Sequence, residues 1–395
     1  MTLPRISDDE RRRRIGVRHL LSSAHRLGDV RRVTEAMTVL HATEAATVHL
    51  AVAQRSEGLT PDDVDAALHD DRSVVKQLAM RRTLFVFPRE LLPAAWGSAA
   101  ARVAGSEGRR VAKMVVGAGI AADGDAWLAA ARAATLERLA HGPATVAQLR
   151  AEVRELAGSV GGTTDKPYDR PAPVAPWVLT HLGLTGATVR GRNAGHWRRN
   201  VPTWSRTEDW LGEVPQPLDE AAGYAELVRR WLATFGAGTA ADIQWWLGST
   251  KAAVSRALVD VTAQEVVLED ETSGWVLPGD VEDTAPLEPW AALLPTLDPP
   301  VMGWKARDFF LDPAHVRQLF DSNGNAGTTA WWDGRVVGCW VQDDAGVVHL
   351  SLIDDVDAAG RAALDREAAR LTGWLAGTVI GNVYASPLMK QARLP

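Results

Sequence analysis

The sequence has little with which to cross a membrane, form a disulfide or ligate a metal. No apolar run approaches the roughly 18 residues that a membrane-spanning helix needs. Cys339 is the single cysteine, so an internal disulfide is excluded, and no histidine stands at a metal-ligand spacing from a cysteine or carboxylate cluster. The N-terminus carries Asp8 and Asp9 where a signal peptide would be apolar. We therefore expect no metal, no cofactor and no membrane partner, and a protein of the reducing cytoplasm.

Several motifs of common enzymes are also missing. The chain has no glycine-rich phosphate loop, no motif around a nucleophilic serine and no dinucleotide fingerprint behind a strand. Its 395 residues exceed what one core of ordinary size accommodates. We expect two to four domains, each with its own apolar core.

Charge is segregated along the chain although the net charge is only -6. Residues 11–32 contain eight arginines and one acid, and residues 170–207 contain six arginines and no acid. Residues 265–300 contain nine acids and no lysine or arginine. Arginine clusters are often only solvated surface, but this pattern also fits one basic face that binds phosphate.

Two segments repeat the same pattern of a helix, a glycine and a threonine cap. Residues 139–149 align without a gap with residues 233–243. The glycines suit the left-handed end of a first helix, and the threonines can accept hydrogen bonds from the free N–H groups of a second. These residues are Gly142 and Thr145 in the first copy, and Gly236 and Thr239 in the second.

Each copy is expected to continue as a winged helix. Ser249 is the expected N-cap of a recognition helix that begins at Lys251, and a fainter copy begins at Thr60. Strand-like residues 81–87, the hairpin of residues 188–199 and the acidic hairpin of residues 265–277 would be the wings. The middle wing carries most of the basic residues, and its Trp197 could stack on a base or sugar.

The C-terminal part changes to proline-rich and strand-rich sequence. Asp333-Gly334 between two β-rich runs is a strong hairpin signal, residues 355–375 have helical spacing, and residues 378–384 suggest a last strand. We therefore expect an α+β fold of tandem winged-helix domains with a small, β-barrel-like C-terminal domain. The expected units are residues 1–115 with the candidate catalytic segment, 116–215 with the basic hairpin, 216–284, and 285–395 with a packing helix.

The stretch from Met37 to Glu44 places two residues that can hold a water molecule one apolar residue apart. A neutral His41 can accept a proton from water, and the Thr43 hydroxyl can hold the same water. If the segment is helical, the two side chains point about 200° apart in projection and share a water only at a kink or a helix end. Glu44 and Glu35 are alternatives for an acidic role. Local capping and packing by both polar residues is the other interpretation.

Taken together, these segments resemble the bacterial winged-helix DNA glycosylases of the AlkZ/YcaQ-like superfamily. The resemblance rests on the winged-helix units, residues 40–43, the segment from Pro202 to Leu211, and the C-terminal residues 293–299 and 333–338. Those enzymes carry Gln-x-Gln or Gln-x-Asp on a helix of the first unit, where the pair positions the water that attacks C1′ of an alkylated nucleotide. His41 and Thr43 stand at those two positions, so this chain departs from the signature.

The resemblance implies a monofunctional glycosylase that releases alkylated purines from duplex DNA in base excision repair, as a monomer in the nucleoid-associated cytoplasm. N7- or N3-alkylated purines are cationic and leave readily, so the enzyme mainly adds a positioned water and electrostatic stabilisation. The residues expected to hold DNA are Arg81, Arg82, Arg190, Arg192, Trp197, Arg198 and Arg199. A non-catalytic DNA-binding regulator or lesion sensor, and a protein-interaction scaffold, remain the alternatives.

Overall fold

The computed structural model describes residues 2–161 and 170–394, which form a mixed α/β protein with four small sheets. No helix in this described part is long and apolar enough to cross a membrane. The elements up to residue 211 are β1 (Arg5–Ile6), α1 (Asp8–Arg18), α2 (Val30–Ala36), β2 (Leu40–His41), α3 (Ala45–Arg55), α4 (Pro61–His69), β3 (Val74–Leu78), β4 (Leu84–Pro88), α5 (Leu92–Ala95), α6 (Ala101–Gly117), α7 (Gly124–Leu139), β5 (Ala144–Thr145), α8 (Val146–Glu152), β6 (Ser159–Val160), β7 (Ala172–Pro173), α9 (Ala175–Leu184), β8 (Thr188–Asn193), β9 (Pro202–Arg206) and α10 (Thr207–Leu211).

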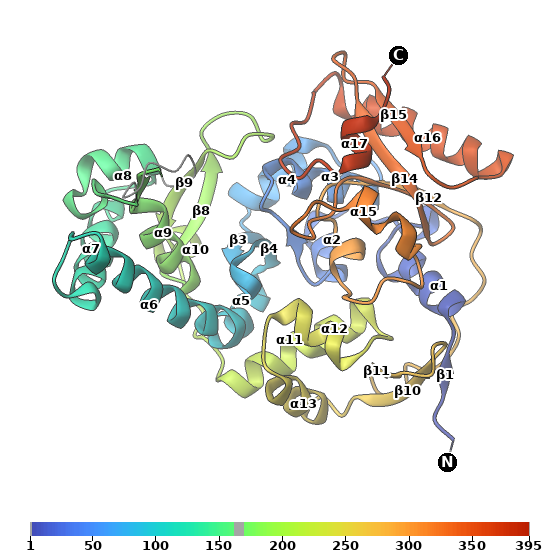
Figure 1. Cartoon of the computed structure of the whole chain (residues 1–395), viewed down its shortest axis with the longest axis horizontal. Helices are drawn as coiled ribbons and strands as arrows, with labels where there is room; N and C mark the ends of the chain where they lie inside the picture. Colours follow the sequence, from blue (N-terminus) through green and yellow to red (C-terminus); the bar gives the residue numbers. More distant parts are fainter. Residues whose placement is uncertain (1, 162–169, 395) are drawn as a thin grey trace.

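The remaining elements belong to a helical layer and a C-terminal sheet. They are α11 (Glu220–Phe235), α12 (Ala240–Leu247), α13 (Lys251–Asp260), β10 (Gln264–Leu268), β11 (Ser273–Val276), β12 (Ala291–Leu294), α14 (Pro299–Met302), α15 (Val316–Leu319), β13 (Thr329–Trp332), β14 (Arg335–Gln342), β15 (Val348–Leu352), α16 (Ala358–Leu375) and α17 (Pro387–Gln391). In Figure 1, helices α6–α9 lie on one side of the central strands β3 and β4, and α15–α17 lie on the other.

Helices begin largely where hydroxyl side chains predict them. Thr60, Thr145 and Thr239 each cap a helix in a capping box, which satisfies backbone N–H groups that have no partner inside the helix. Helix α13 is capped by Thr250 rather than by the expected Ser249. Gly236 was expected to be left-handed, but its φ is −67° and it continues as extended backbone.

The largest sheet joins the first two expected units. Its strand order is β2-β4-β3-β8-β9-β5, and Lys76 of β3 pairs with Arg190 of β8 where the two hairpins meet. The expected strand over residues 81–87 begins only at Leu84, and the second hairpin returns at Pro202, so residues 194–201 form its loop. The β3–β4 and β8–β9 hairpins therefore form one continuous sheet, because β3, which the sequence did not predict as a strand, pairs with β8.

The C-terminal sheet is open and is not the expected barrel. Strands β12-β13-β14-β15 pair in sequence order, and within the described residues β12 and β15 do not pair with each other. Asp333 and Gly334 form the predicted tight turn with φ of 45° and 82°. Helix α16 packs on this sheet as predicted, with Leu364, Leu371 and Leu375 buried against it. One helix covers the apolar face, so closure into a barrel is not needed.

Residues 378–384 do not form the expected last strand. The backbone N–H of Ile380 donates to Oε1 of Gln342 at 2.9 Å, and that of Tyr384 donates to Oε1 of Glu44 at 3.1 Å. Side-chain oxygens, and not a neighbouring strand, thus accept hydrogen bonds from these backbone N–H groups. Residues 378–384 form an irregular segment beside α3.

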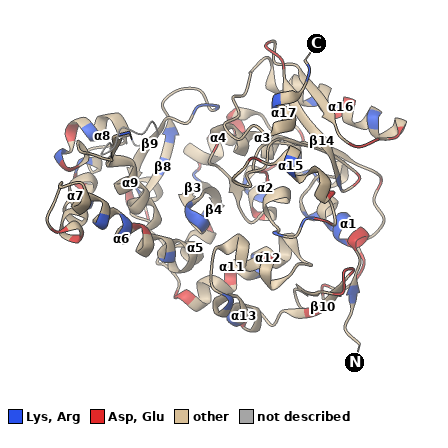
Figure 2. Cartoon of the chain, in the orientation of Figure 1, with Lys and Arg blue, Asp and Glu red and all other residues tan. Residues whose placement is uncertain are grey.

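The basic N-terminal stretch meets the acidic stretch of residues 265–300 in the fold. Basic and acidic segments lie next to each other at α1 in Figure 2. Arg14 and Arg18 pair with Asp280 at 3.4 and 2.7 Å, and Arg5 pairs with Glu271 at 2.7 Å. Two arginines of the basic stretch therefore pair with the acidic stretch, and this part of the expected basic face lies inside the protein.

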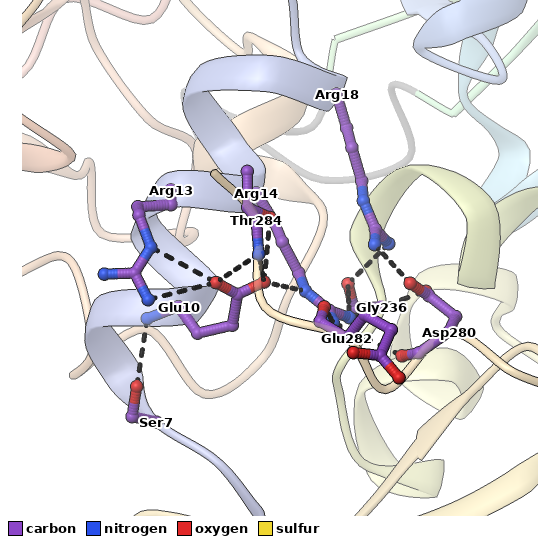
Figure 3. Close-up of polar contacts among 9 residues, drawn as sticks. All are labelled: Ser7, Glu10, Arg13, Arg14, Arg18, Gly236, Asp280, Glu282 and Thr284. Atoms are coloured by element: carbon purple, nitrogen blue, oxygen red, sulfur yellow. Dashed lines mark hydrogen bonds and ion pairs between the residues drawn. The ribbon is translucent and has the colours of Figure 1, made fainter. Parts of the chain in front are cut away.

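Glu10 lies at the centre of this contact (Figure 3). Its fully buried carboxylate accepts from Nε of Arg14 at 2.6 Å and from the backbone N–H of Thr284 at 3.0 Å. Burial alone would raise the pKa of Glu10, but hydrogen bonds from Arg14 and Thr284 hold that pKa below its ordinary value. The network ties α1 to the segment that leads into the C-terminal sheet.

Candidate active site

The His41–Thr43 segment is the end of a short strand and its continuation, not part of a helix. Leu40 and His41 form β2, which pairs antiparallel with β4, and the N–H of Ala42 donates to the carbonyl oxygen of Leu84 at 3.0 Å. In an extended chain, side chains two residues apart point to the same side. His41 and Thr43 accordingly both line one cleft, whereas Ala42 between them is buried.

This cleft has a volume of about 410 Å³ and lies between the strand ends, α9, the β8–β9 loop and the C-terminal segments. Its lining residues are His41, Thr43, Leu78, Arg82, Thr83, Leu84, Pro176, Trp177, Thr180, Arg190, Asn200, Leu297, Asn325 and Tyr384. Among these described residues there are two arginines and no carboxylate. The cleft therefore combines hydrogen-bonding groups with two arginine side chains, of which Arg82 is paired with Glu107.

His41 is the most unusual of these residues. Its side chain is 6% exposed, and neither ring nitrogen has a hydrogen-bond partner within the described protein. Its ring centroid lies 4.8 Å from that of Phe85. Burial, and secondarily the charge of Arg81, lowers the pKa of His41 to about 3. The imidazole is neutral at physiological pH, and both of its nitrogens are shielded from solvent in this arrangement, so a water or ligand in the cleft reaches one of them only after the ring or its neighbours move.

Glu44 is next in sequence but does not line the cleft. Its Oε2 accepts from the hydroxyl of Thr296 at 2.6 Å, and its Oε1 accepts from the backbone N–H groups of Val383 and Tyr384. The side chain is 7% exposed. The structure thus directs the carboxylate toward the C-terminal segments and away from His41.

The two arginines of the β3–β4 turn have different surroundings. Arg82 lines the cleft and pairs with Oε2 of Glu107 at 3.3 Å. The Arg81 guanidinium lies 4.3 Å from the centroid of the Trp245 ring and does not line the cleft. Both residues have positive φ, 54° and 58°, which turns consecutive side chains in different directions. Only Arg82 of this pair joins the site.

Strand β8 supplies one further arginine to the cleft. Arg190 lines the cleft and lies over the Trp204 ring at 5.1 Å, and burial lowers its pKa to about 10, so it stays charged. Its Nε is buried without a partner within the described residues. Arg192 is exposed and pairs with Oδ1 of Asp70 at 2.5 Å.

The β8–β9 loop is docked on the C-terminal part of the protein. The Trp197 ring stacks on His49 with 4.7 Å between centroids and meets the Trp374 ring edge-on at 6.0 Å. Arg198 donates to the carbonyl oxygen of Val379, and Arg199 is exposed. Of the expected DNA-binding residues, the structure brings Arg82 and Arg190 to the cleft, while Arg81, Arg192, Trp197, Arg198 and Arg199 lie outside it.

Sequence reasoning missed several cleft residues. Trp177 of α9, Leu297, Asn325 and Tyr384 come from segments far apart in the chain, and of these only Leu297 lies in a segment that carried the family resemblance. Asn200 had a weak signal, because it lies in the same loop as the expected basic residues, and its Nδ2 reaches the carbonyl oxygen of Thr43 at 3.5 Å. Only tertiary packing places these side chains together.

A larger cleft of about 820 Å³ lies elsewhere, against α1, residues 284–291 and α16. Of its charged lining residues, Arg26 and Glu367 pair with each other at 3.0 Å. None of the candidate site residues lines this cleft. The smaller cleft is therefore the better candidate for chemistry because the unpartnered His41 lies there.

Comparison with known proteins agrees with this fold. The model of the AlkZ-like DNA glycosylase family matches residues 34–374. The structure is similar to that of Streptomyces sahachiroi DNA glycosylase AlkZ, with a TM-score of 0.73 and 19% sequence identity, covering 93% of this chain and 96% of that one. No curated protein matches the chain by sequence. The family model covers most of the chain, and the fold agrees with it. The chain is therefore a member of the AlkZ-like DNA glycosylase family.

Proposed function

We propose that the protein hydrolyses the N-glycosidic bond of alkylated purines in duplex DNA, with His41 and Thr43 positioning the attacking water. The observation that carries this proposal is the His41 ring, which lines the cleft while both of its nitrogens are shielded from solvent and have no partner among the described residues. Burying polar groups without partners is costly, so a water or ligand that reached one of these nitrogens would supply a hydrogen bond that the described residues do not. Family membership supports the reaction class.

The proposed reaction requires the cleft to hold and orient one water molecule. A cationic N7- or N3-alkylated base leaves without a proton, and C1′ then needs a water held in line. The neutral imidazole would accept a hydrogen bond from that water, and Thr43 would provide a second polar contact from the same side of the extended segment. Arg82 and Arg190 would hold the flanking phosphates at the cleft, and the exposed Arg192, Arg198 and Arg199 would contact phosphates farther along the duplex. Arg81 and Trp197, which pack against other side chains, would contact DNA only if those contacts opened.

Release of 7-methylguanine from alkylated duplex DNA by the purified protein tests the proposal. We expect His41→Ala to lower the rate constant about tenfold, the effect of one lost hydrogen bond to the attacking water, because a group with a pKa of about 3 is a weak general base at neutral pH. Thr43→Val removes the hydroxyl at similar volume and should give a smaller loss. His41→Gln is the matched control, because an amide oxygen can accept the same hydrogen bond, and it should retain part of the activity.

A non-catalytic lesion sensor is the second candidate function. The absence of a carboxylate among the described lining residues favours it, because the developing positive charge at C1′ would meet two arginines. Tight, salt-dependent DNA binding without base release would identify the sensor. Absence of DNA binding would leave a protein-interaction scaffold. We further propose that the protein acts as a monomer, which sedimentation with and without duplex DNA would test.

A further inference from the structure

Three chain segments that build the cleft converge on the carboxylate of Glu44. Glu44 directly follows Thr43, so it is fixed to the candidate catalytic segment. Its Oε2 accepts from Oγ1 of Thr296 at 2.6 Å, and Thr296 directly precedes Leu297. Its Oε1 accepts from the N–H of Tyr384 at 3.1 Å and from that of Val383. Thr43, Leu297 and Tyr384 all line the cleft.

These contacts fix two backbone segments, at Thr296–Leu297 and at Val383–Tyr384, that have no regular secondary structure. Leu297 has a φ of 60°, a left-handed conformation that a leucine adopts only where its surroundings impose it. Val383 and Tyr384 lie in an irregular turn between α16 and α17. Without Glu44, the buried Thr296 hydroxyl would lose its acceptor, and so would the N–H groups of the exposed Val383 and the half-buried Tyr384, so other positions of these segments would compete.

The same contacts leave Glu44 little capacity for proton transfer. Its two oxygens accept three hydrogen bonds from groups outside the cleft, and the side chain is 7% exposed. A general base must reach the water it activates, and Glu44 does not line the space in which that water would lie.

We propose that Glu44 is a positioning residue of this site, which ties the Thr296–Leu297 and Val383–Tyr384 turns to the His41–Thr43 segment and thereby sets the cleft wall. The inference deepens the proposed glycosylase function and rests on it for its kinetic consequence. Its structural part, a carboxylate that orders two remote turns, stands independently of catalysis.

Two substitutions separate positioning from acid–base chemistry. Glu44→Gln keeps an amide oxygen for the two N–H groups and a polar group for Thr296, but it cannot take up a proton. Glu44→Ala removes every acceptor. For positioning, kcat/KM of base release should fall about tenfold or more in Glu44→Ala and stay within about threefold of wild type in Glu44→Gln, tenfold being the effect of one lost hydrogen bond of ordinary strength.

Equal losses in both variants, or no loss in Glu44→Ala, would overturn the proposal. The same holds if Glu44→Gln changes the pH profile of kcat/KM. Glu57→Ala, which removes an exposed carboxylate just beyond the other end of α3, is the matched control for charge. If Glu44→Ala does not fold, Thr296→Val removes one donor from the same contact and should reproduce a smaller part of the loss.

Hydrogen exchange provides a readout that does not depend on base release. The Val383 and Tyr384 amides should be protected in the wild type and in Glu44→Gln and should exchange faster in Glu44→Ala. Unchanged protection in Glu44→Ala would overturn the proposal. If the wild type released no base, the proposed function would fail, but the exchange data would still decide whether Glu44 orders the two turns.

Discussion

The guanidinium of Arg55 and the carboxylate of Asp298 form an ion pair with an Nη2–Oδ1 distance of 2.5 Å, and both side chains are fully buried. A second contact joins Nη1 of Arg55 to Oδ2 of Asp298 at 3.1 Å. Asp298 directly follows the left-handed Leu297 at the cleft, and Arg55 is the last residue of α3. The pair thus joins the helix behind the candidate catalytic segment to the turn that forms the cleft wall.

We expect Asp298→Asn to lower the free energy of unfolding by about 3–5 kcal/mol, because it leaves the Arg55 charge buried without a counter-charge. Urea denaturation followed by tryptophan fluorescence measures this change. The double variant Arg55→Met/Asp298→Asn should lose less than the sum of the single losses, since the two groups interact. Asp365→Asn, which removes the partner of Arg361 from an exposed pair, should change little. A neutral Asp298→Asn variant would show that the buried pair does not hold this turn.

The depressed pKa of His41 predicts a loss of stability in acid. The folded pKa is about 3 and the unfolded value about 6.5, so the unfolded chain binds the proton first as the pH falls. The contribution of neutral His41 to the free energy of unfolding is fully present above about pH 6.5 and declines continuously as the pH falls toward about 3. At about pH 5 the expected loss is about 2 kcal/mol.

His41→Gln cannot titrate and should remove that part of the acid dependence. Urea unfolding of the wild type and His41→Gln at about pH 7.5 and about pH 5 measures this contribution. The difference between the free energies of unfolding of the two proteins should change between the two pH values. His19, whose pKa burial also lowers to about 3, stays in both proteins and cancels in the comparison. The same slope with pH in both proteins would mean that His41 is solvated in solution.

Arg190 is expected to contribute to DNA affinity more than Arg192. Arg190 is charged and points into the cleft, whereas Arg192 is paired with Asp70. If Arg190 contacts one phosphate, Arg190→Gln should reduce the slope of log K against log salt by about 0.9. Arg192→Gln, the matched variant on the same strand, should change the slope less. Fluorescence anisotropy with a labelled duplex at several salt concentrations makes the comparison, and an unchanged slope in Arg190→Gln would exclude a phosphate contact.

Glu10 is expected to be important for stability rather than for DNA binding. Glu10→Ala removes the acceptor of Arg14 and Thr284 inside the protein, so the free energy of unfolding should fall by about 3 kcal/mol. DNA affinity measured well below the unfolding transition should stay the same. Glu271→Ala, which breaks the exposed pair with Arg5, is the control and should leave stability nearly unchanged. A loss of DNA affinity in folded Glu10→Ala would show that this network shapes the binding surface.

Local chemistry made much of the secondary structure predictable. Thr60, Thr145 and Thr239 begin helices because their hydroxyls satisfy N–H groups within three residues. The Asp333-Gly334 turn follows from the φ values that those two residues tolerate. The barrel and the strand over residues 378–384 were wrong, since pairing of distant strands depends on partners that a single segment does not reveal.

The sequence by itself determined the helix starts, the tight turn, the segregation of charge and the family resemblance, because each rests on neighbouring residues or on an order of motifs. Only the tertiary structure decided where the charges act, and there the basic N-terminal stretch pairs with the acidic stretch near residue 280. It also placed His41 and Thr43 on one side of an extended segment, brought Arg190 to the cleft and directed the Glu44 carboxylate away from the cleft. Side-chain direction and burial arise from contacts between segments hundreds of residues apart, and no local pattern specifies them.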